Sequence, residues 1–151
     1  MTEQSGRSLI EVLGVLAIGA IITAAAVGMY SQIRGSARRQ FAITQMSDVA
    51  RDAKLLMGAR GDYSGISVEY LVQMGALQNG ATPIGDAWEI TATDDGAAFA
   101  INLTGLTSGE CAYFETVSAP FAQTVQINGY DVADTSHCFS TATNRVSFIV
   151  K

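Results

Sequence analysis

A run of nineteen residues without a charged side chain, Val12–Tyr30, lies near the N-terminus of this 151-residue chain. Thr23 carries the only hydroxyl group in the run before Tyr30. As a helix, the run would rise about 28 Å at 1.5 Å per residue, which is close to the hydrocarbon thickness of a bilayer. The run therefore predicts a helix that lies in a membrane or in the apolar core of an assembly.

The helical pattern continues beyond this run. Between Ile33 and Met57, apolar residues recur at intervals of three and four among charged ones, which is typical of an amphipathic helix. The sequence predicts one helix over about residues 7–57, with a hydrophobic part at 7–30 and an amphipathic continuation at 31–57. The segment Ala24-Ala25-Ala26 resembles the end of a secretory signal, so a conventional signal peptide stays open as an alternative.

Residues 58–151 predict a globular head with mixed secondary structure. The expected elements are a helix at 64–77 ended by Asn79-Gly80, strands at 87–93 and 97–103 joined by a turn at Asp94-Asp95-Gly96, a helix within 107–118, a short strand at 124–127 followed by the turn Asn128-Gly129, and a final strand at 144–150. The predicted fold class is α+β, with the long N-terminal helix packed against a small antiparallel sheet.

A basic segment precedes an acidic one along the chain. Residues 34–60 hold six basic and two acidic residues, whereas residues 61–151 hold ten acidic and two basic residues. Such complementary charge favours contacts between copies of the same chain. A basic segment next to a membrane surface explains the first cluster equally well.

The head contains the two cysteines of the chain, Cys111 and Cys138. Two cysteines in a head attached to an apolar helix fit an oxidising compartment and a single disulfide. Two free buried thiols are the alternative. With no CxxC motif and a single histidine, the sequence predicts neither a metal site nor a cofactor.

Glu11 is the acidic residue at the edge of the apolar run. A carboxylate at the centre of a spanning helix costs roughly 2.5–3.5 kcal/mol, so it requires a positively charged partner or contact with water. If the chain were cut before residue 7, a free amino group would lie about one helical turn away and could neutralise Glu11 of a neighbouring copy. The alternative is a glutamate at the membrane interface that reaches the headgroups.

The stretch Gly6-Arg7-Ser8-Leu9-Ile10-Glu11, followed by the apolar residues 12–18, resembles the processing site of type IV prepilins and related pseudopilins. The resemblance implies that residues 1–6 are a short leader and that a prepilin peptidase cuts between Gly6 and Arg7. It also implies that the new N-terminus is methylated and that Glu11 is the carboxylate needed for assembly. Arg7 stands where this family usually has an apolar residue.

The head adds to this resemblance, because the family has a C-terminal region bounded by a disulfide, which Cys111 and Cys138 would form. Residues 82–111 resemble the head of class B pilins of enteric and conjugative thin pili. The resemblance implies a pilin fold and a filament made of copies of the chain. It implies an inner-membrane location and contact with lipid before assembly, contact with the inner-membrane assembly machinery, and a place on the cell surface afterwards.

The expected function is therefore that of a structural subunit of a type IV pilus, not of an enzyme. His137 beside Cys138 gives no free nucleophile if that cysteine is oxidised, and Ser136 lacks the glycines of a nucleophile elbow. The basic segment lacks interleaved aromatic residues, so no nucleic-acid partner is expected. The alternatives are a minor pilin, a type II secretion pseudopilin, or a single-pass membrane-anchored binding module that does not polymerise.

Overall fold

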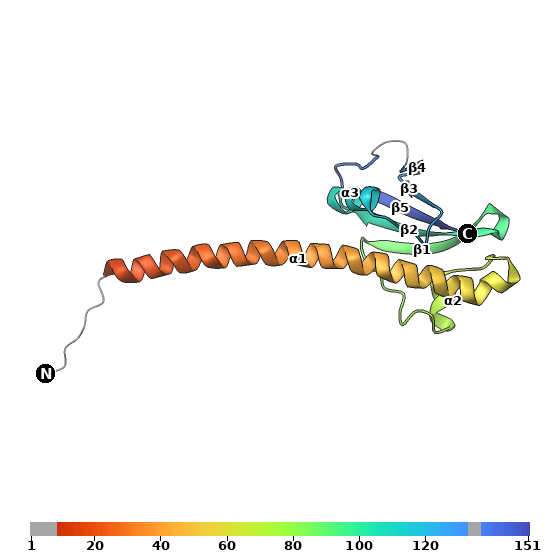
Figure 1. Ribbon diagram of the computed structural model, residues 1–151, viewed down its shortest axis with the longest axis horizontal. Coiled ribbons are helices and arrows are strands. Elements are labelled where there is room, and N and C mark those ends of the chain that lie inside the picture. Colours follow the sequence, from red (N-terminus) through yellow and green to blue (C-terminus); the bar gives the residue numbers. More distant parts are fainter. Residues whose placement is uncertain (1–8, 133–136) are drawn as a thin grey trace. The chain divides into compact units, whose positions relative to one another are not determined.

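The computed structural model describes residues 9–132 and 137–151, and the chain divides into two compact units, the residues up to Ala37 and Arg38–Lys151. The elements, labelled in Figure 1, are α1 (Leu9–Met57), the 3-10 turn η1 (Gly58–Arg60), α2 (Val68–Gln73), β1 (Ala87–Thr93), the 3-10 turn η2 (Asp94–Gly96), β2 (Ala98–Leu106), α3 (Ser108–Thr116), β3 (Thr124–Ile127), β4 (Tyr130–Asp131) and β5 (Asn144–Val150). This order confirms the predicted α+β class. The predicted division into a leader, a hydrophobic part, an amphipathic part and a head stays a prediction.

Helix α1 confirms the predicted long helix and ends at Met57 as expected, while residues 7 and 8 lie outside the described residues. The chain continues from Met57 into η1, and Gly61 ends that turn with a φ of 65° and an N–H that donates to the carbonyl of Gly58 at 3.0 Å. Glycine adopts this left-handed conformation without the steric cost that a Cβ brings. In the second unit, the buried residues of α1 recur every three or four positions and form one face: Ala42, Met46, Val49, Ala50, Ala53 and Met57.

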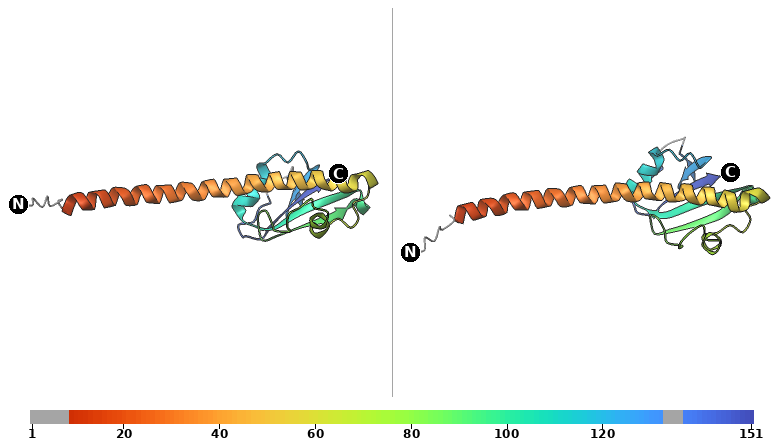
Figure 2. Two further views of the ribbon diagram at one scale, coloured as in Figure 1. Left: turned by 90° about the horizontal axis from the view of Figure 1, so that it is seen from below. Right: turned by 60° about the horizontal axis from the view of Figure 1, so that its bottom comes forward.

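The sheet consists of five strands in the order β1-β2-β5-β3-β4, and all its pairings are antiparallel. Residues 38–57 of α1 run along one face of it (Figures 1 and 2). Alternate strand residues pack with the buried face of α1 in one core, among them Ile90, Ile101 and Phe148. The other face of the sheet carries mainly polar side chains, which is the usual alternation of an antiparallel sheet covered on one side.

The hairpin of β1 and β2 confirms both predicted strands and the turn between them. Its register pairs Ala87 with Thr104 and Thr93 with Ala98. Strand β2 extends to Leu106, beyond the predicted end at residue 103, because Leu106 still pairs with Asn144 of β5 after an irregularity between Leu103 and Leu106. Gly105 lies in this irregular stretch with a φ of 71°, and a Cβ there would collide with the carboxylate of Asp86.

The predicted helix at 64–77 is wrong in extent, because α2 covers only Val68–Gln73. Ser67 starts it as N-cap, since its side chain accepts a hydrogen bond from the N–H of Tyr70 at 3.1 Å. Gly75 ends it with a φ of 77° in a Schellman motif, in which the N–H of Ala76 donates to the carbonyl of Leu71. Asn79-Gly80 therefore lies beyond the helix that it was expected to end.

The other predicted elements of the head are present at the predicted positions. Helix α3 begins after Thr107, which forms a capping box with Glu110. The turn at Asn128-Gly129 follows β3 as expected and leads into β4, a two-residue strand too short to give a signal in the sequence. Strand β5 runs over 144–150 as predicted.

Candidate assembly site

The apolar surface of α1 is the largest unusual feature of the first unit. Each large apolar side chain from Leu9 to Ile33 is exposed, from 45% at Val12 to 77% at Ile10. Among the described residues, this is the one helix long and apolar enough to cross a membrane, with a mean hydropathy of 2.4 in its most apolar window. Monomeric soluble proteins rarely expose so much contiguous apolar surface, so lipid or other protein must cover it.

Glu11 lies in the first turn of α1, beside Val12, Val15 and Leu16. A carboxylate there is favoured by the positive end of the helix dipole. None of the ion pairs in the described part of the chain involves Glu11. The predicted cleavage site, Gly6 and Arg7, lies outside the described residues, so the structure places only one of the three residues of the predicted processing and assembly site.

Cys111 of α3 forms a disulfide with Cys138, with their Cα atoms 5.8 Å apart. This pairing excludes the alternative of two free thiols. The carboxylate of Glu115 lies within 4.8 Å of both sulfur atoms, but sulfur atoms in a disulfide are not thiolate ligands, so these three residues do not form a metal-binding set. His137 stacks on Tyr130 with ring centroids 4.2 Å apart, and its backbone N–H donates to Glu115 at 3.0 Å.

The loop that contains Cys138 is fixed from inside by Asn144, which is fully buried. Its amide oxygen accepts hydrogen bonds from the N–H of Phe139 at 2.7 Å and from Nδ2 of Asn128 at 3.0 Å. Its Nδ2 donates to the carbonyls of Leu106, Phe139 and Thr141. Asn128 also donates to the carbonyl of His137 at 2.7 Å. This pair was not predicted from the sequence. The signal that points to it is Asn144 at the start of a predicted strand, a position where asparagine is depleted.

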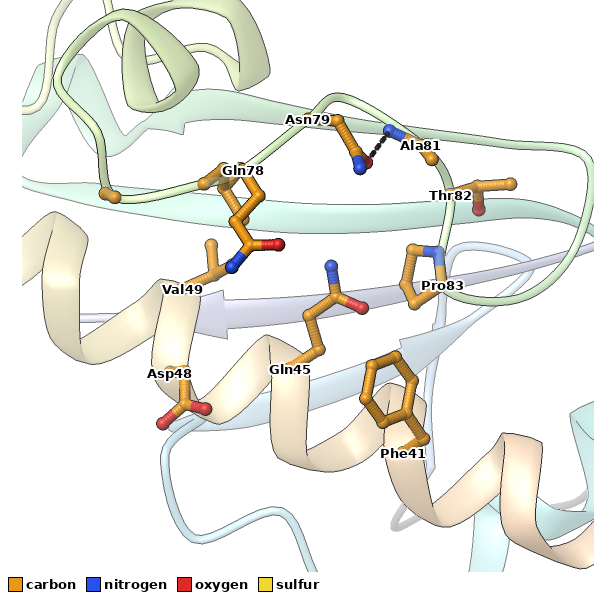
Figure 3. A pocket seen from close by; sticks show the side chains of 11 residues that line it. Phe41, Gln45, Asp48, Val49, Gln78, Asn79, Ala81, Thr82 and Pro83 are labelled. Atoms are coloured by element: carbon orange, nitrogen blue, oxygen red, sulfur yellow. Dashed lines mark hydrogen bonds between the residues drawn. The ribbon is translucent and has the colours of Figure 1, made fainter.

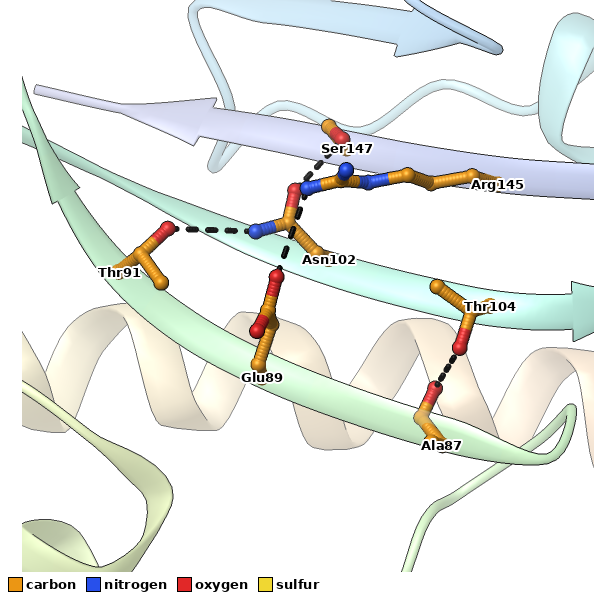
Figure 4. Close-up of polar contacts among 7 residues, drawn as sticks. All are labelled: Ala87, Glu89, Thr91, Asn102, Thr104, Arg145 and Ser147. Atoms are coloured by element: carbon orange, nitrogen blue, oxygen red, sulfur yellow. Dashed lines mark hydrogen bonds and ion pairs between the residues drawn. The ribbon is translucent and has the colours of Figure 1, made fainter.

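A polar chain crosses the sheet on the face turned away from α1 (Figure 4). Asn102 of β2 is 2% exposed, accepts from Oγ of Ser147 at 2.6 Å and donates to Oγ1 of Thr91 at 3.3 Å. Above it, Arg145 reaches over β2 to Glu89 at 3.5 Å. These contacts join β1, β2 and β5 side by side, so we assign them to the stability of the sheet.

A groove of about 490 Å³ lies between α1 and the segment 76–83 (Figure 3). Phe41 and Pro83 line one end of it, and the amides of Gln45 and Gln78 line its middle. The side chain of Phe41 is 64% exposed. An exposed aromatic residue beside a groove is typical of a surface that contacts other protein.

The cations of the second unit differ in their partners. Arg51 pairs with Asp48 and Asp52 at 3.3 Å each. In contrast, the guanidinium of Arg39 lies over the ring of Tyr113, 5.2 Å from its centroid. The Nε atom of Arg39 is buried and has no hydrogen-bond acceptor in the described part of the chain.

Asp62 is the one described group with a clearly shifted pKa, and it follows the last turn of η1. The pKa of Asp62 is lowered, chiefly by a hydrogen bond from the side chain of Ser64 and then by one from its backbone N–H. The charge of Arg60 lowers it further, and desolvation opposes these effects without cancelling them. The N–H of Ser64 lies 2.8 Å from Oδ1 of Asp62. This shift reflects the local turn that Asp62 forms with Ser64.

Three features together define the fold of a type IV pilin. They are a long helix with an exposed apolar N-terminal part, a sheet packed on the C-terminal part of that helix, and a region closed by a disulfide before the last strand. The structure is similar to the crystal structure of TcpA, a type IV pilin from Vibrio cholerae El Tor biotype, with a TM-score of 0.61. The match covers 76% of this chain and 99% of the TcpA chain at 18% sequence identity. No protein-family model and no curated protein matches the sequence. The predicted pilin fold is thereby confirmed.

Proposed function

We propose that this chain is a structural subunit that polymerises into a type IV pilus through its N-terminal helix. The observation that carries the proposal is the exposed apolar surface from Leu9 to Ile33, with Glu11 as its one charge before Arg34. The apolar surface of such a helix would be covered by lipid in the membrane and by the helices of neighbouring copies in a filament. The pilin fold of the head supports the same conclusion.

In this proposal, prepilin peptidase removes residues 1–6 by cutting between Gly6 and Arg7, and the amine of Arg7 is then methylated. The subunit waits in the inner membrane with its helix in lipid. The inner-membrane assembly machinery then extracts it into a filament on the cell surface. The pilus would serve adhesion, motility, aggregation or conjugative mating contact.

Energetics explain why Glu11 matters in this scheme. Covering the apolar helix stabilises it by roughly 20–40 kcal/mol relative to water, at about 1.5–3 kcal/mol per large side chain. Relative to lipid the gain is far smaller, because lipid tails are as apolar as the neighbouring helices. Charge pairing between Glu11 and the N-terminal amine of the next copy would then decide how the helices align.

Replacement of Glu11 by Ala tests the proposal. We expect the variant to insert into the membrane as the unsubstituted chain does and to yield no filaments in a sheared cell-surface fraction. Thr23→Ala is the matched control, because Thr23 lies on the same exposed helix and its hydroxyl donates to the carbonyl of Gly19 within that helix. Normal filament yield from Glu11→Ala would refute the assigned role. The mass of the N-terminal peptide would show whether residues 1–6 are absent and a methyl group is present.

The same experiment separates the alternatives. A membrane-anchored binding module gives no filaments from the unsubstituted chain and is indifferent to Glu11→Ala. A minor pilin or a type II secretion pseudopilin gives short or rare filaments, which electron microscopy distinguishes from an abundant pilus.

A further inference from the structure

Two adjacent arginines, Arg38 and Arg39, begin the second unit, and neither has a carboxylate partner in the described part of the chain. Of the other cations of this unit, Arg51, Arg145 and Lys151 make ion pairs, whereas Lys54 and Arg60 make none in the described part of the chain. Arg38 is exposed. Arg39 stacks on Tyr113 and its buried Nε lacks an acceptor. The start of the head therefore presents two guanidinium groups with unused donors.

The stacking of Arg39 determines which side of it is available. A guanidinium has five N–H donors in one plane and binds a carboxylate through the edge of that plane. Tyr113 covers one flat face of Arg39, which leaves the donors at the edge directed sideways. Because the ring already fixes the guanidinium, a carboxylate that binds there costs less side-chain entropy than it would on a free arginine.

The acidic residues of the head are the complementary charge. Residues 61–151 hold ten acidic and two basic residues. Among the described acidic residues, Glu69, Asp86 and Asp95 are exposed and make no ion pair within the chain. Within one chain, these carboxylates do not pair with Arg38 or Arg39. A second copy of the chain can bring one of its carboxylates to these arginines.

Anionic lipid is the competing source of negative charge. Along α1, Arg38 follows the end of the uncharged run at Tyr30 by eight residues, or about 12 Å at 1.5 Å per residue. The headgroup region on each side of a bilayer is only about 5–7 Å thick. Arg38 therefore lies beyond the headgroups in a helix that spans the bilayer upright, and this favours a protein partner.

We propose that Arg38 and Arg39 bind a carboxylate of a neighbouring copy, supplied by Glu69, Asp86 or Asp95, and that this pair sets the register of the heads in the filament. The inference rests on the proposed polymerisation. It adds to it a contact between heads, separate from the contact that Glu11 makes in the helical core.

Charge reversal tests the pair in the full chain with its own assembly machinery. We expect Arg38→Glu to reduce filament yield about tenfold or more, because a like charge replaces a complementary one. Arg51→Gln is the matched control, since Arg51 is an exposed arginine of α1 that is already paired within its own chain. This control variant should leave the filament yield unchanged. An intact disulfide and unaltered thermal unfolding of Arg38→Glu would show that the head is folded.

Second-site reversal identifies the partner. Arg38→Glu is combined in turn with Glu69→Lys, Asp86→Lys and Asp95→Lys, and one combination is expected to restore most of the yield. Normal yield from Arg38→Glu alone, or no restoration by any of the three, would overturn the pair. Loss of binding to phosphatidylglycerol vesicles with normal filaments would assign the arginines to lipid instead. Absence of filaments from the unsubstituted chain would overturn the proposed function itself.

Discussion

The two parts of α1 belong to one continuous helix but are stabilised in different ways. From Leu9 to Ala37, no described residue of the helix is buried within the chain. From Arg38 to Met57, one face is buried against the sheet, with Met46 and Ala53 fully covered. The second part obtains its stability from tertiary packing, whereas the first must obtain it from lipid or from other protein. Truncation of a large apolar side chain to alanine should therefore destabilise the head in the second part and leave its stability unchanged in the first.

Met46→Ala and Leu16→Ala put this comparison to its strongest test. Met46 is fully buried, and its truncation should lower the free energy of unfolding of the head by about 2–5 kcal/mol. Leu16 is 63% exposed, so its truncation should leave that free energy unchanged. Chemical unfolding of both variants in the same detergent measures the difference. Equal losses in the two variants would mean that the first part also packs within its own chain.

The disulfide is the next largest contribution, and it acts only on the second unit. Replacing Cys111 and Cys138 together by alanine should cost about 3 kcal/mol, as expected for a cross-link that closes a loop of this length. The loss should equal the effect of a reducing agent on the unsubstituted chain and should leave helix content in detergent intact. A variant that unfolds at the same denaturant concentration as the unsubstituted chain would contradict this.

Asn144→Ala should follow, with a loss of about 1–3 kcal/mol, because it leaves buried carbonyls and the N–H of Phe139 without a partner. Asn79→Ala is the control, since Asn79 is exposed and its side chain makes one local hydrogen bond, to the N–H of Ala81. Hydrogen exchange should become faster in residues 137–143 before the rest of the head. Uniform exchange across the head would mean that Asn144 does not hold this loop in particular.

The two parts of the molecule also differ in how far the sequence predicts them. The long helix and the β1–β2 hairpin depend on local signals, namely a charge-free run, an apolar period and the turn at Asp94-Asp95-Gly96, so both were predictable. Helix α2 was predicted too long because the stop at Gly75 lies inside an apolar period that continues to Leu77. A local stop signal of this kind outweighs the period that surrounds it.

The parts of the candidate site that the sequence did not reveal depend on contacts between distant segments. Asn144 bonds to the carbonyl of Leu106, and Arg39 stacks on Tyr113, and neither pair shares a local pattern. The cysteine pair was predictable because the chain contains only two. Gly6, Arg7 and the role of Glu11 stay predictions, since they concern a cut and a partner copy and not the folded chain.

The smallest expected effect concerns acid stability, and it should be confined to the second unit. Hydrogen bonds from Ser64 lower the pKa of Asp62, so the folded state favours the charged carboxylate. The stability that this provides is fully present above the unfolded pKa of about 3.9 and is lost as the pH falls through the lower folded pKa. Asp62→Asn should therefore flatten the dependence of thermal unfolding on pH below about 4.

Asp95→Asn is the matched control for this change, because Asp95 is an exposed acid whose side chain makes no hydrogen bond in the described part of the head. It should leave the acid limb of the curve in place. If thermal unfolding of Asp62→Asn kept the full pH dependence of the unsubstituted chain, Asp62 would not be the source of this acid-sensitive stability.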